Sequence, residues 1–356
     1  MNMGLDFNRL VRTRATRPGS RLHELVGFGS NPGQLKAWFF APPGKTRVPL
    51  VVALHGCTQT AAGYDTGTGW SELAQAHGFA VLLPEQQRSN NPSVCFNWFE
   101  PGDARRRTGE PLSIAQMIDA MVEQHDVDPA RVFITGLSAG GAMTSNMLAA
   151  YPEKFAGGAI LAGLPHGAAT SMQEAFQQMR AYAPTSRSDG RAVRESSAHQ
   201  AKWPAVSIWH GTADVVVDPS NADGILRQWQ EIHGVRNAPD EEGPVDGHPR
   251  RAWHDASGRM VIEEYRVLGM GHGVPLAVAG DCGCGETGAF MLEAGISSTC
   301  HSAQTWGLLD SSVTMAPRPA RAAAKPAAAK PAGLKRAGGG VGQVIDDALR
   351  AAGLMR

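Results

Sequence analysis

A serine flanked by glycines lies where an apolar run of the chain gives way to a helical pattern. The segment 136–140 (GLSAG) follows the apolar run RVFIT and precedes GAMTSNMLAAYPEKF, a helix candidate. Such a strand–turn–helix sets a serine on a tight elbow at the carboxyl end of a sheet, where its hydroxyl can attack a carbonyl carbon. Glycines suit the elbow because a crowded turn leaves no room for side chains beside the serine. Ser138 is therefore the predicted nucleophile of an acyl-transfer site.

A serine hydroxyl also needs a base to take its proton and an acid to orient that base. The partners of an elbow serine follow it in the order acid, then histidine. Asp214 comes after the apolar run AVSIWHG, and His272 lies in a glycine-rich loop after a later run. We predict Asp214 as the acid and His272 as the general base. Asp218 is the alternative acid, and His301, beyond the last clear strand, is the alternative base.

Acyl transfer further requires two N–H groups aimed at the oxygen that becomes negative. The residue after the nucleophile, Ala139, supplies one of them. The second comes from the loop after an early strand, and here PLVVALHG leads into the loop at 55–58. We assign the second donor to the backbone N–H of Cys57, with that of Thr58 as the alternative.

The elements that must position these residues are short apolar runs that alternate with helical stretches. PLVVALHG, FAVLLPE, RVFITG, GAILAG and AVSIWHG have the pattern of buried parallel strands, and SIAQMIDAMVEQHD is typical of a helix between strands. This alternation predicts an α/β fold, with a mostly parallel central sheet and helices on both faces.

The chain has 356 residues, is 42% hydrophobic and contains 8 Trp, which is enough for a sizeable core. Residues 1–21 are predicted to form a basic arm, and residues 22–312 a single catalytic domain. Residues 313–356, rich in Ala, Lys and Pro, are predicted to be a flexible tail with a candidate short helix at its end. The tail is basic and suits contact with an anionic surface, although a solvated linker is the simpler interpretation. A net charge of zero argues against a chain devoted to nucleic acid.

The five cysteines are an odd number, so at least one has no disulfide partner within the chain. Cys282 and Cys284 have the spacing of half a metal site, but no second pair follows them, and no metal is expected. No run of about 18 apolar residues predicts a membrane span. The first 20 residues also lack the apolar run of a secretory signal peptide.

Long segments of the chain resemble the polyhydroxybutyrate depolymerase family of esterases, which is related to feruloyl and acetylxylan esterases. The segments lie within residues 22–310 and, in chain order, are LHGCTQTAAGYDTGTGW, GFAVLLPEQ, CFNWFEPGD, VDPARVFITGLSAGGAM, AAYPEKFAGGAILAGLP and WHGTADVVV. The resemblance implies an α/β-hydrolase fold and ester hydrolysis without metal or cofactor. The family's nucleophile, acid and base fall on Ser138, Asp214 and His272, and its oxyanion donors fall on Cys57 and Ala139.

The resemblance also implies residues that the motifs alone do not. The family's half-buried tryptophan beside the active site corresponds to Trp98, and Trp98, Asn97 and His55 are the predicted substrate-binding residues. The family's disulfide between the loop at 55–58 and the NWF segment falls on Cys57 and Cys95.

The resemblance favours a serine esterase that hydrolyses short-chain hydroxyalkanoate polyester or its oligomers. A feruloyl or acetylxylan-type carboxylesterase is the alternative, and a granule-binding protein with a vestigial site is a third option. The expected partner is an ester or polyester substrate, with the tail in contact with an anionic surface or polymer granule and no nucleic acid required. The family implies an extracellular enzyme, whereas the N-terminal sequence leaves a cytoplasmic, granule-associated enzyme as the alternative.

Overall fold

A computed structural model describes residues 21–185, 188–197, 199–279 and 283–309. The basic arm, apart from Arg21, and the basic tail lie outside these residues. None of the helices in the described ranges is long and apolar enough to cross a membrane. The elements are β1 (His23–Glu24), β2 (Lys36–Phe40), β3 (Val48–Leu54), α1 (Ala61–Thr68), α2 (Trp70–His77), β4 (Ala80–Glu85), α3 (Gly109–His125), β5 (Val127–Leu137), α4 (Ala139–Ala150), η1 (Pro152–Lys154), β6 (Gly157–Leu161), α5 (Met172–Arg180), α6 (Gly190–Ser197), β7 (Ala205–Gly211), α7 (Ser220–His233), β8 (Glu241–Val245), β9 (His248–His254), β10 (Met260–Val267), β11 (Val274–Leu276), β12 (Met291–Glu293) and α8 (Ser298–Thr305).

The strands form one 10-stranded sheet in the order β1-β2-β4-β3-β5-β6-β7-β10-β9-β8, and β11 and β12 pair separately. From β4 to β10 every neighbouring pair in this order is parallel. The strands at both edges are antiparallel. The predicted mostly parallel sheet is confirmed, because the apolar runs that alternate with helices form its parallel centre.

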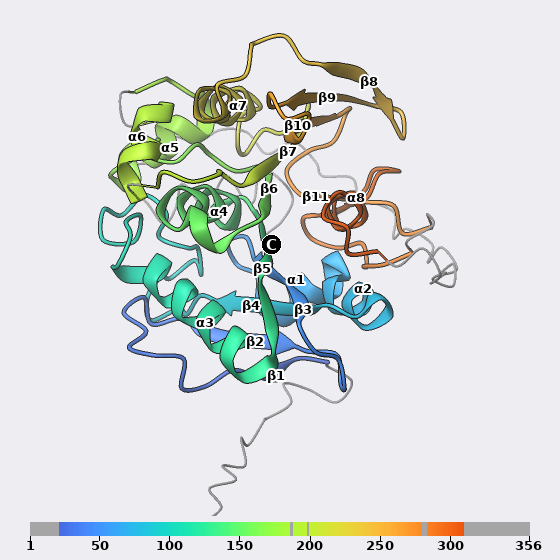
Figure 1. Ribbon diagram of the computed structural model, residues 1–356. Coiled ribbons are helices and arrows are strands. Elements are labelled where there is room, and N and C mark those ends of the chain that lie inside the picture. Colours follow the sequence, from blue (N-terminus) through green and yellow to red (C-terminus); the bar gives the residue numbers. More distant parts are fainter. Residues whose placement is uncertain (1–20, 186–187, 198, 280–282, 310–356) are drawn as a thin grey trace, which may run out of the picture.

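Helices cover both faces of this sheet, as Figure 1 shows for α3, α4 and α7 on one side and for α1, α2 and α8 on the other. The alternation of side chains along β3 divides the core accordingly. Leu50, Val52 and Leu54 belong to the cluster beneath α3 and α4, whereas Val51 and Ala53 face α1 and α2. All five side chains are buried, which is why the run PLVVAL is apolar throughout rather than alternating.

Glycines allow α4 to approach the sheet at the point where β5 ends. A Cβ atom on Gly140 would lie 2.3 Å from the carbonyl oxygen of Leu54 and 2.6 Å from that of His55. A Cβ atom on Gly136 would lie 2.4 Å from the carbonyl oxygen of Gly140. The start of α4 is therefore pressed against the ends of β3 and β5, and side chains at these two positions would push it away.

Replacing Gly140 with Ala is expected to lower the free energy of unfolding by about 3 kcal/mol, because the added methyl group meets rigid backbone oxygens. Gly243→Ala is the matched control, since a Cβ atom there meets nothing within 4 Å, and its effect should stay below about 0.5 kcal/mol. Urea unfolding of both variants measures the difference. Equal stabilities would contradict the close approach described here.

Candidate active site

Ser138 lies between β5 and α4 in a backbone conformation that non-glycine residues rarely adopt, with φ 58° and ψ −116°. Its N–H donates to the carbonyl oxygen of Leu161 on β6 at 2.9 Å, and its own carbonyl oxygen accepts from the N–H of Ala142 at 2.8 Å. Such a conformation costs about 1–3 kcal/mol and persists only where the surrounding structure holds it. The neighbouring strand and the first turn of α4 hold it here.

The loops after β7 and β10 are joined because these two strands are parallel neighbours whose carboxyl ends meet at one edge of the sheet. The N–H of Ala213 donates to the carbonyl oxygen of Met270 at 3.0 Å, and that of Thr212 donates to Val267 at 2.9 Å. A Cβ atom on Gly211 would lie 2.3 Å from the Met270 oxygen, so the two backbones are in contact. This contact brings Asp214 and His272, 58 positions apart in the sequence, to the same place.

The Asp214 carboxylate is 2.8 Å from Nδ1 of His272 through its Oδ2 atom. Its Oδ1 atom accepts hydrogen bonds from the N–H groups of Val216 and Val217 at 2.9 and 3.0 Å. Burial alone would raise the pKa of Asp214, but the contacts with His210 and His272 outweigh burial and hold this pKa well below its usual range. A charged carboxylate therefore fixes the ring of His272, with Nδ1–H directed at the acid and Nε2 left for the substrate side.

The two sequence alternatives to this pair are engaged elsewhere. Asp218 accepts a hydrogen bond at 2.9 Å from the N–H of Ser220, the first residue of α7, and so stabilises the start of that helix. His301 on α8 places Nε2 2.8 Å from the carboxylate of Asp246. Neither residue lines the pocket that contains Ser138 and His272.

That pocket has a volume of about 170 Å³ and lies at the carboxyl edge of the parallel strands. Its described lining is mostly apolar and consists of Gly56, Cys57, Asn91, Cys95, Trp98, Phe99, Leu137, Ser138, Ala139, Leu164, Met172, Ala175, Phe176, Met179, Arg180, Val215, Val216, Val217, His272 and Phe290. Among the described residues, no hydrogen bond joins the Ser138 hydroxyl to the His272 ring. In enzymes, the hydrogen bond between a nucleophile and its base is often long without substrate and tightens only in the complex.

Two backbone N–H groups on the pocket wall have no acceptor within the described chain. Ala139 is the first residue of α4, so its N–H has no carbonyl partner inside the helix. No hydrogen bond of the described residues uses the N–H of Cys57, whereas that of Thr58 donates to the carbonyl oxygen of Ser93 at 2.8 Å. Of the two candidates in this loop, only the Cys57 N–H is therefore available to a bound oxygen.

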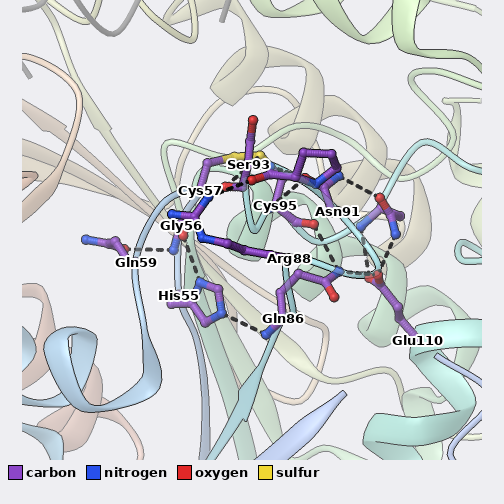
Figure 2. Close-up of a disulfide and its surroundings, with 12 residues drawn as sticks. His55, Gly56, Cys57, Gln59, Gln86, Arg88, Asn91, Ser93, Cys95 and Glu110 are labelled. Atoms are coloured by element: carbon purple, nitrogen blue, oxygen red, sulfur yellow. Dashed lines mark hydrogen bonds between the residues drawn. A yellow bond between two sulfur atoms is a disulfide. The ribbon is translucent and has the colours of Figure 1, made fainter. Parts of the chain in front are cut away.

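A disulfide joins Cys57 to Cys95, as predicted, with Cα atoms 4.2 Å apart (Figure 2). Closing a loop of sequence separation 38 stabilises the folded chain by about 4 kcal/mol in the chain-entropy model. Thr58, beside the bond, has a positive φ of 64°, and Gly56 donates to Gln59 Oε1 at 2.8 Å. The disulfide and the hydrogen bond from Gly56 to Gln59 therefore both hold the loop that carries the free N–H of Cys57.

Near the disulfide lies the buried carboxyl group of Glu110 (Figure 2), which holds the segment that carries Cys95 and Trp98. It accepts from the N–H of Asn97 at 2.9 Å, from Asn97 Nδ2 at 3.0 Å and from Gln86 Nε2 at 2.6 Å. Burial, followed by the nearby charge of Asp103, raises the pKa of Glu110 well above its ordinary value, although these donors favour the charged form.

The three predicted substrate-binding residues lie in different places. Trp98 is buried and lines the pocket. Asn97 is turned to Glu110 and Asn91, whose Nδ2 donates to Asn97 Oδ1 at 2.8 Å. His55 lies 2.7 Å from the carbonyl oxygen of Gly56 through Nδ1, and its Nε2 accepts from the N–H of Gln86 at 3.1 Å. Asn97 and His55 do not line the pocket, because their polar atoms are used in holding the two walls together.

The structure adds site residues that the sequence analysis missed. His210 on β7 is buried, with Nε2 3.4 Å from Asp214 Oδ2 and 2.9 Å from the carbonyl oxygen of Val217. Phe290 has a positive φ of 62° and sets its ring edge-on to His272, with ring centroids 5.9 Å apart. Of the site residues that were not predicted, only those on the pocket-lining face of α5 carried a signal in the sequence. That signal is the helical spacing of Met172, Phe176 and Met179.

No group of three or more metal-ligating side chains occurs within the described ranges. Cys282 lies outside the described residues, so the half-site at 282–284 is not described as a whole. Cys284 is buried, with its sulfur 3.7 Å from that of Cys300.

The chain order of elbow serine, acid and histidine, each after a strand of one mostly parallel sheet, is that of the α/β-hydrolases, and the molecule is one of them. The family described as Esterase PHB depolymerase matches residues 35–243. A poly(3-hydroxyalkanoate) depolymerase C from Paucimonas lemoignei is 44% identical over 292 residues, which cover 81% of this chain and 70% of that protein. The chain therefore belongs to the PHB depolymerase family of esterases, and it is a carboxylic ester hydrolase.

More distant relatives carry other esterase names. An acetylxylan esterase from Coprinopsis cinerea is 32% identical over 267 residues, covering 72% of this chain and 70% of that protein. A feruloyl esterase B from Neurospora crassa is 31% identical over 276 residues, covering 75% of this chain and 92% of that protein. The solved acetyl xylan esterase from Aspergillus awamori has the same fold, with a TM-score of 0.69 at 23% identity over 82% of this chain and 100% of that one.

Replacing Glu110 with Gln is expected to change how stability depends on pH. Because the folded protein keeps a proton on Glu110 above its ordinary pKa of 4.5, the unfolded chain loses that proton first as the pH rises. Above pH 4.5 the stability of the wild type should therefore fall relative to Glu110→Gln, by about 1.4 kcal/mol per pH unit, until the folded pKa is reached. Urea unfolding across pH 4–8 measures it.

Glu123→Gln is the matched control for this experiment, since Glu123 is an exposed residue of the same helix. Its stability difference from the wild type should stay constant over that pH range. A constant difference for Glu110→Gln as well, or a slope of opposite sign, would contradict a raised pKa at Glu110.

Proposed function

We propose that this chain hydrolyses short-chain hydroxyalkanoate esters, polymeric or oligomeric, through an acyl-enzyme on Ser138. The observation that carries the proposal is the charged Asp214 bound to His272 in the pocket that also contains the elbow serine. In this mechanism His272 Nε2 takes the Ser138 proton as the oxygen attacks the ester carbonyl, and it then protonates the departing alcohol. Water, deprotonated by the same ring, releases the acid and restores the serine.

The N–H groups of Cys57 and Ala139 are proposed to bind the oxygen of the tetrahedral intermediate. Both line the pocket beside Ser138, and neither is used within the described chain. Losing one such donor typically lowers kcat by about 10²- to 10³-fold. The disulfide and the start of α4 hold these two donors in fixed positions before substrate arrives, so their alignment requires no rearrangement during the reaction.

The apolar lining favours a hydroxyalkanoate over a carbohydrate ester as the substrate. Trp98, Phe99, Phe176 and Met179 offer carbon surface to the aliphatic units of such a chain. The relative at 44% identity is named as a depolymerase of poly(3-hydroxyalkanoate), which agrees with this choice. A feruloyl or acetylxylan esterase is the second candidate, supported by the relatives at 31% and 32% identity.

A comparison of two ester classes tests the substrate. We expect the purified protein to hydrolyse 3-hydroxybutyrate trimers with a kcat/KM at least about tenfold above that for methyl ferulate or acetylated xylo-oligosaccharide. A small difference in how well a substrate fits an apolar pocket changes kcat/KM by about that factor. Product release measured by chromatography gives both values. The reverse preference would support the second candidate, and hydrolysis of no ester would refute the proposal.

Substitution of the two aspartates by Asn tests the assigned acid. Asp214→Asn should lower kcat by about 10⁴-fold, because the ring of His272 would then be held in the wrong tautomer. Asp218→Asn should lower it by less than about tenfold, since Asp218 serves α7. Ser138→Ala gives the background rate, and circular dichroism checks that all three variants fold. A larger loss in Asp218→Asn than in Asp214→Asn would overturn the assignment.

A further inference from the structure

One face of α5 forms a wall of the active-site pocket. Met172, Ala175, Phe176, Met179 and Arg180 all line the pocket, at the spacing that brings residues onto one side of a helix. The wall is apolar from Met172 to Met179 and ends in a guanidinium group. At about 1.5 Å per residue, it is about 12 Å long.

Arg180 is the lining residue with a permanent charge. Among the lining residues that the structure describes, His272 is the other group able to become positive, and none is an Asp or Glu. Asp214 does not line the pocket, and its two oxygens are used by His272 and by backbone N–H groups. The permanently charged group on the described lining is thus a cation, the exposed Arg180, and a cation at the pocket attracts an anionic group.

Within the described residues, Arg180 has no carboxylate partner of the kind that several other arginines have. Arg106 reaches Glu153 at 2.7 Å, and Arg266 reaches Asp223 at 2.5 Å. No carboxylate of the described residues lies within 4.0 Å of the Arg180 guanidinium. Asp218 is close along the backbone, since its N–H donates to the carbonyl oxygen of Met179, but its carboxylate is bonded to the N–H of Ser220.

A helix-capping role would explain a basic residue at the end of α5 but not its place in the pocket. Arginine at the last turn of a helix interacts favourably with the helix dipole whether or not it contacts a ligand. Arg180, however, continues the apolar face of α5 and lines the same space as Ser138 and His272. An apolar wall that ends in a guanidinium with no carboxylate partner among the described residues matches a substrate with an aliphatic body and a carboxylate end.

We propose that Arg180 binds the free carboxylate of the substrate, so that the enzyme prefers hydroxy-acid oligomers with an ionised carboxyl end to neutral esters of the same length. This inference rests on the proposed function and narrows its substrate class. The aliphatic units lie along Met172, Phe176 and Met179, the carboxylate meets Arg180, and an ester bond of the same molecule lies at Ser138. Soluble oligomers have such an end on every short molecule, whereas the interior of a long polyester chain has none.

The test compares 3-hydroxybutyrate trimer with its methyl ester, which removes only the negative charge. The ratio of kcat/KM for the acid to kcat/KM for the methyl ester should exceed one in the wild type. Arg180→Gln should lower this ratio by about tenfold, the size expected for a partly screened hydrogen bond between charged groups. Arg180→Lys should keep part of the preference because it keeps the charge without the planar fork.

Arg227→Gln is the matched control. Arg227 is an exposed arginine on α7 that lies over the ring of Tyr182, with 5.5 Å from the guanidinium carbon to the ring centroid, and it does not line the pocket. Its ratio should equal that of the wild type. Added salt should lower the wild-type ratio and leave that of Arg180→Gln unaltered, because screening weakens an ion pair near solvent.

Binding separates this inference from the proposed function. In a Ser138→Ala background, calorimetry should show the trimer acid binding about tenfold more weakly when Arg180→Gln is added. If the wild type hydrolyses neither trimer but binding still depends on Arg180, the proposed function fails and the carboxylate site stands. If Arg180→Gln changes neither the ratio nor the binding by more than about twofold, the inference is overturned.

Discussion

The left-handed backbone of Ser138 is the constraint on which the site depends. With φ at 58°, the serine turns its hydroxyl out of the sheet while the chain reverses directly into α4. The same turn presents the N–H of Ala139 to the pocket. This conformation is maintained because β6 accepts the serine N–H and because glycines let α4 lie against β3 and β5. A strained residue in a rigid setting is typical of sites that must be preorganised.

Two buried carboxyl groups of the site have pKa values that are shifted in opposite directions. Asp214 receives two backbone N–H groups and two histidine rings, and these favour its charged form. Glu110 also receives several donors, but it lies fully buried near the charge of Asp103, and its pKa rises. The first group needs its charge to orient His272. The second needs only to accept hydrogen bonds, since it holds the backbone that carries the disulfide and Trp98.

Local signals in the sequence predicted the central part of this arrangement. The elbow at 136–140, the loop at 55–58 and the apolar runs are each recognisable within a few residues, so the parallel sheet and the order of its site residues could be predicted. His210 and Phe290 could not, because a histidine inside a strand and a phenylalanine in a loop acquire a role only when the loop after β7 and the segment near β12 approach His272. The family resemblance located the disulfide, but it could not show that the side chains of Asn97 and His55 turn away from the pocket.

The distance along the chain between the elbow serine and its histidine has a consequence for how activity arises during synthesis. Ser138 and His272 are separated by 134 positions (272 − 138), and β7 and β10 must pair before Asp214 and His272 can meet. Contacts of such high sequence separation form late, because the entropy lost in closing long loops is regained only when the sheet is nearly complete. With the proposed roles of these residues, a nascent chain that has emerged only as far as β7 contains the serine but not the histidine that is to activate it. On that assignment, esterase activity appears only once the sheet that joins these residues is complete.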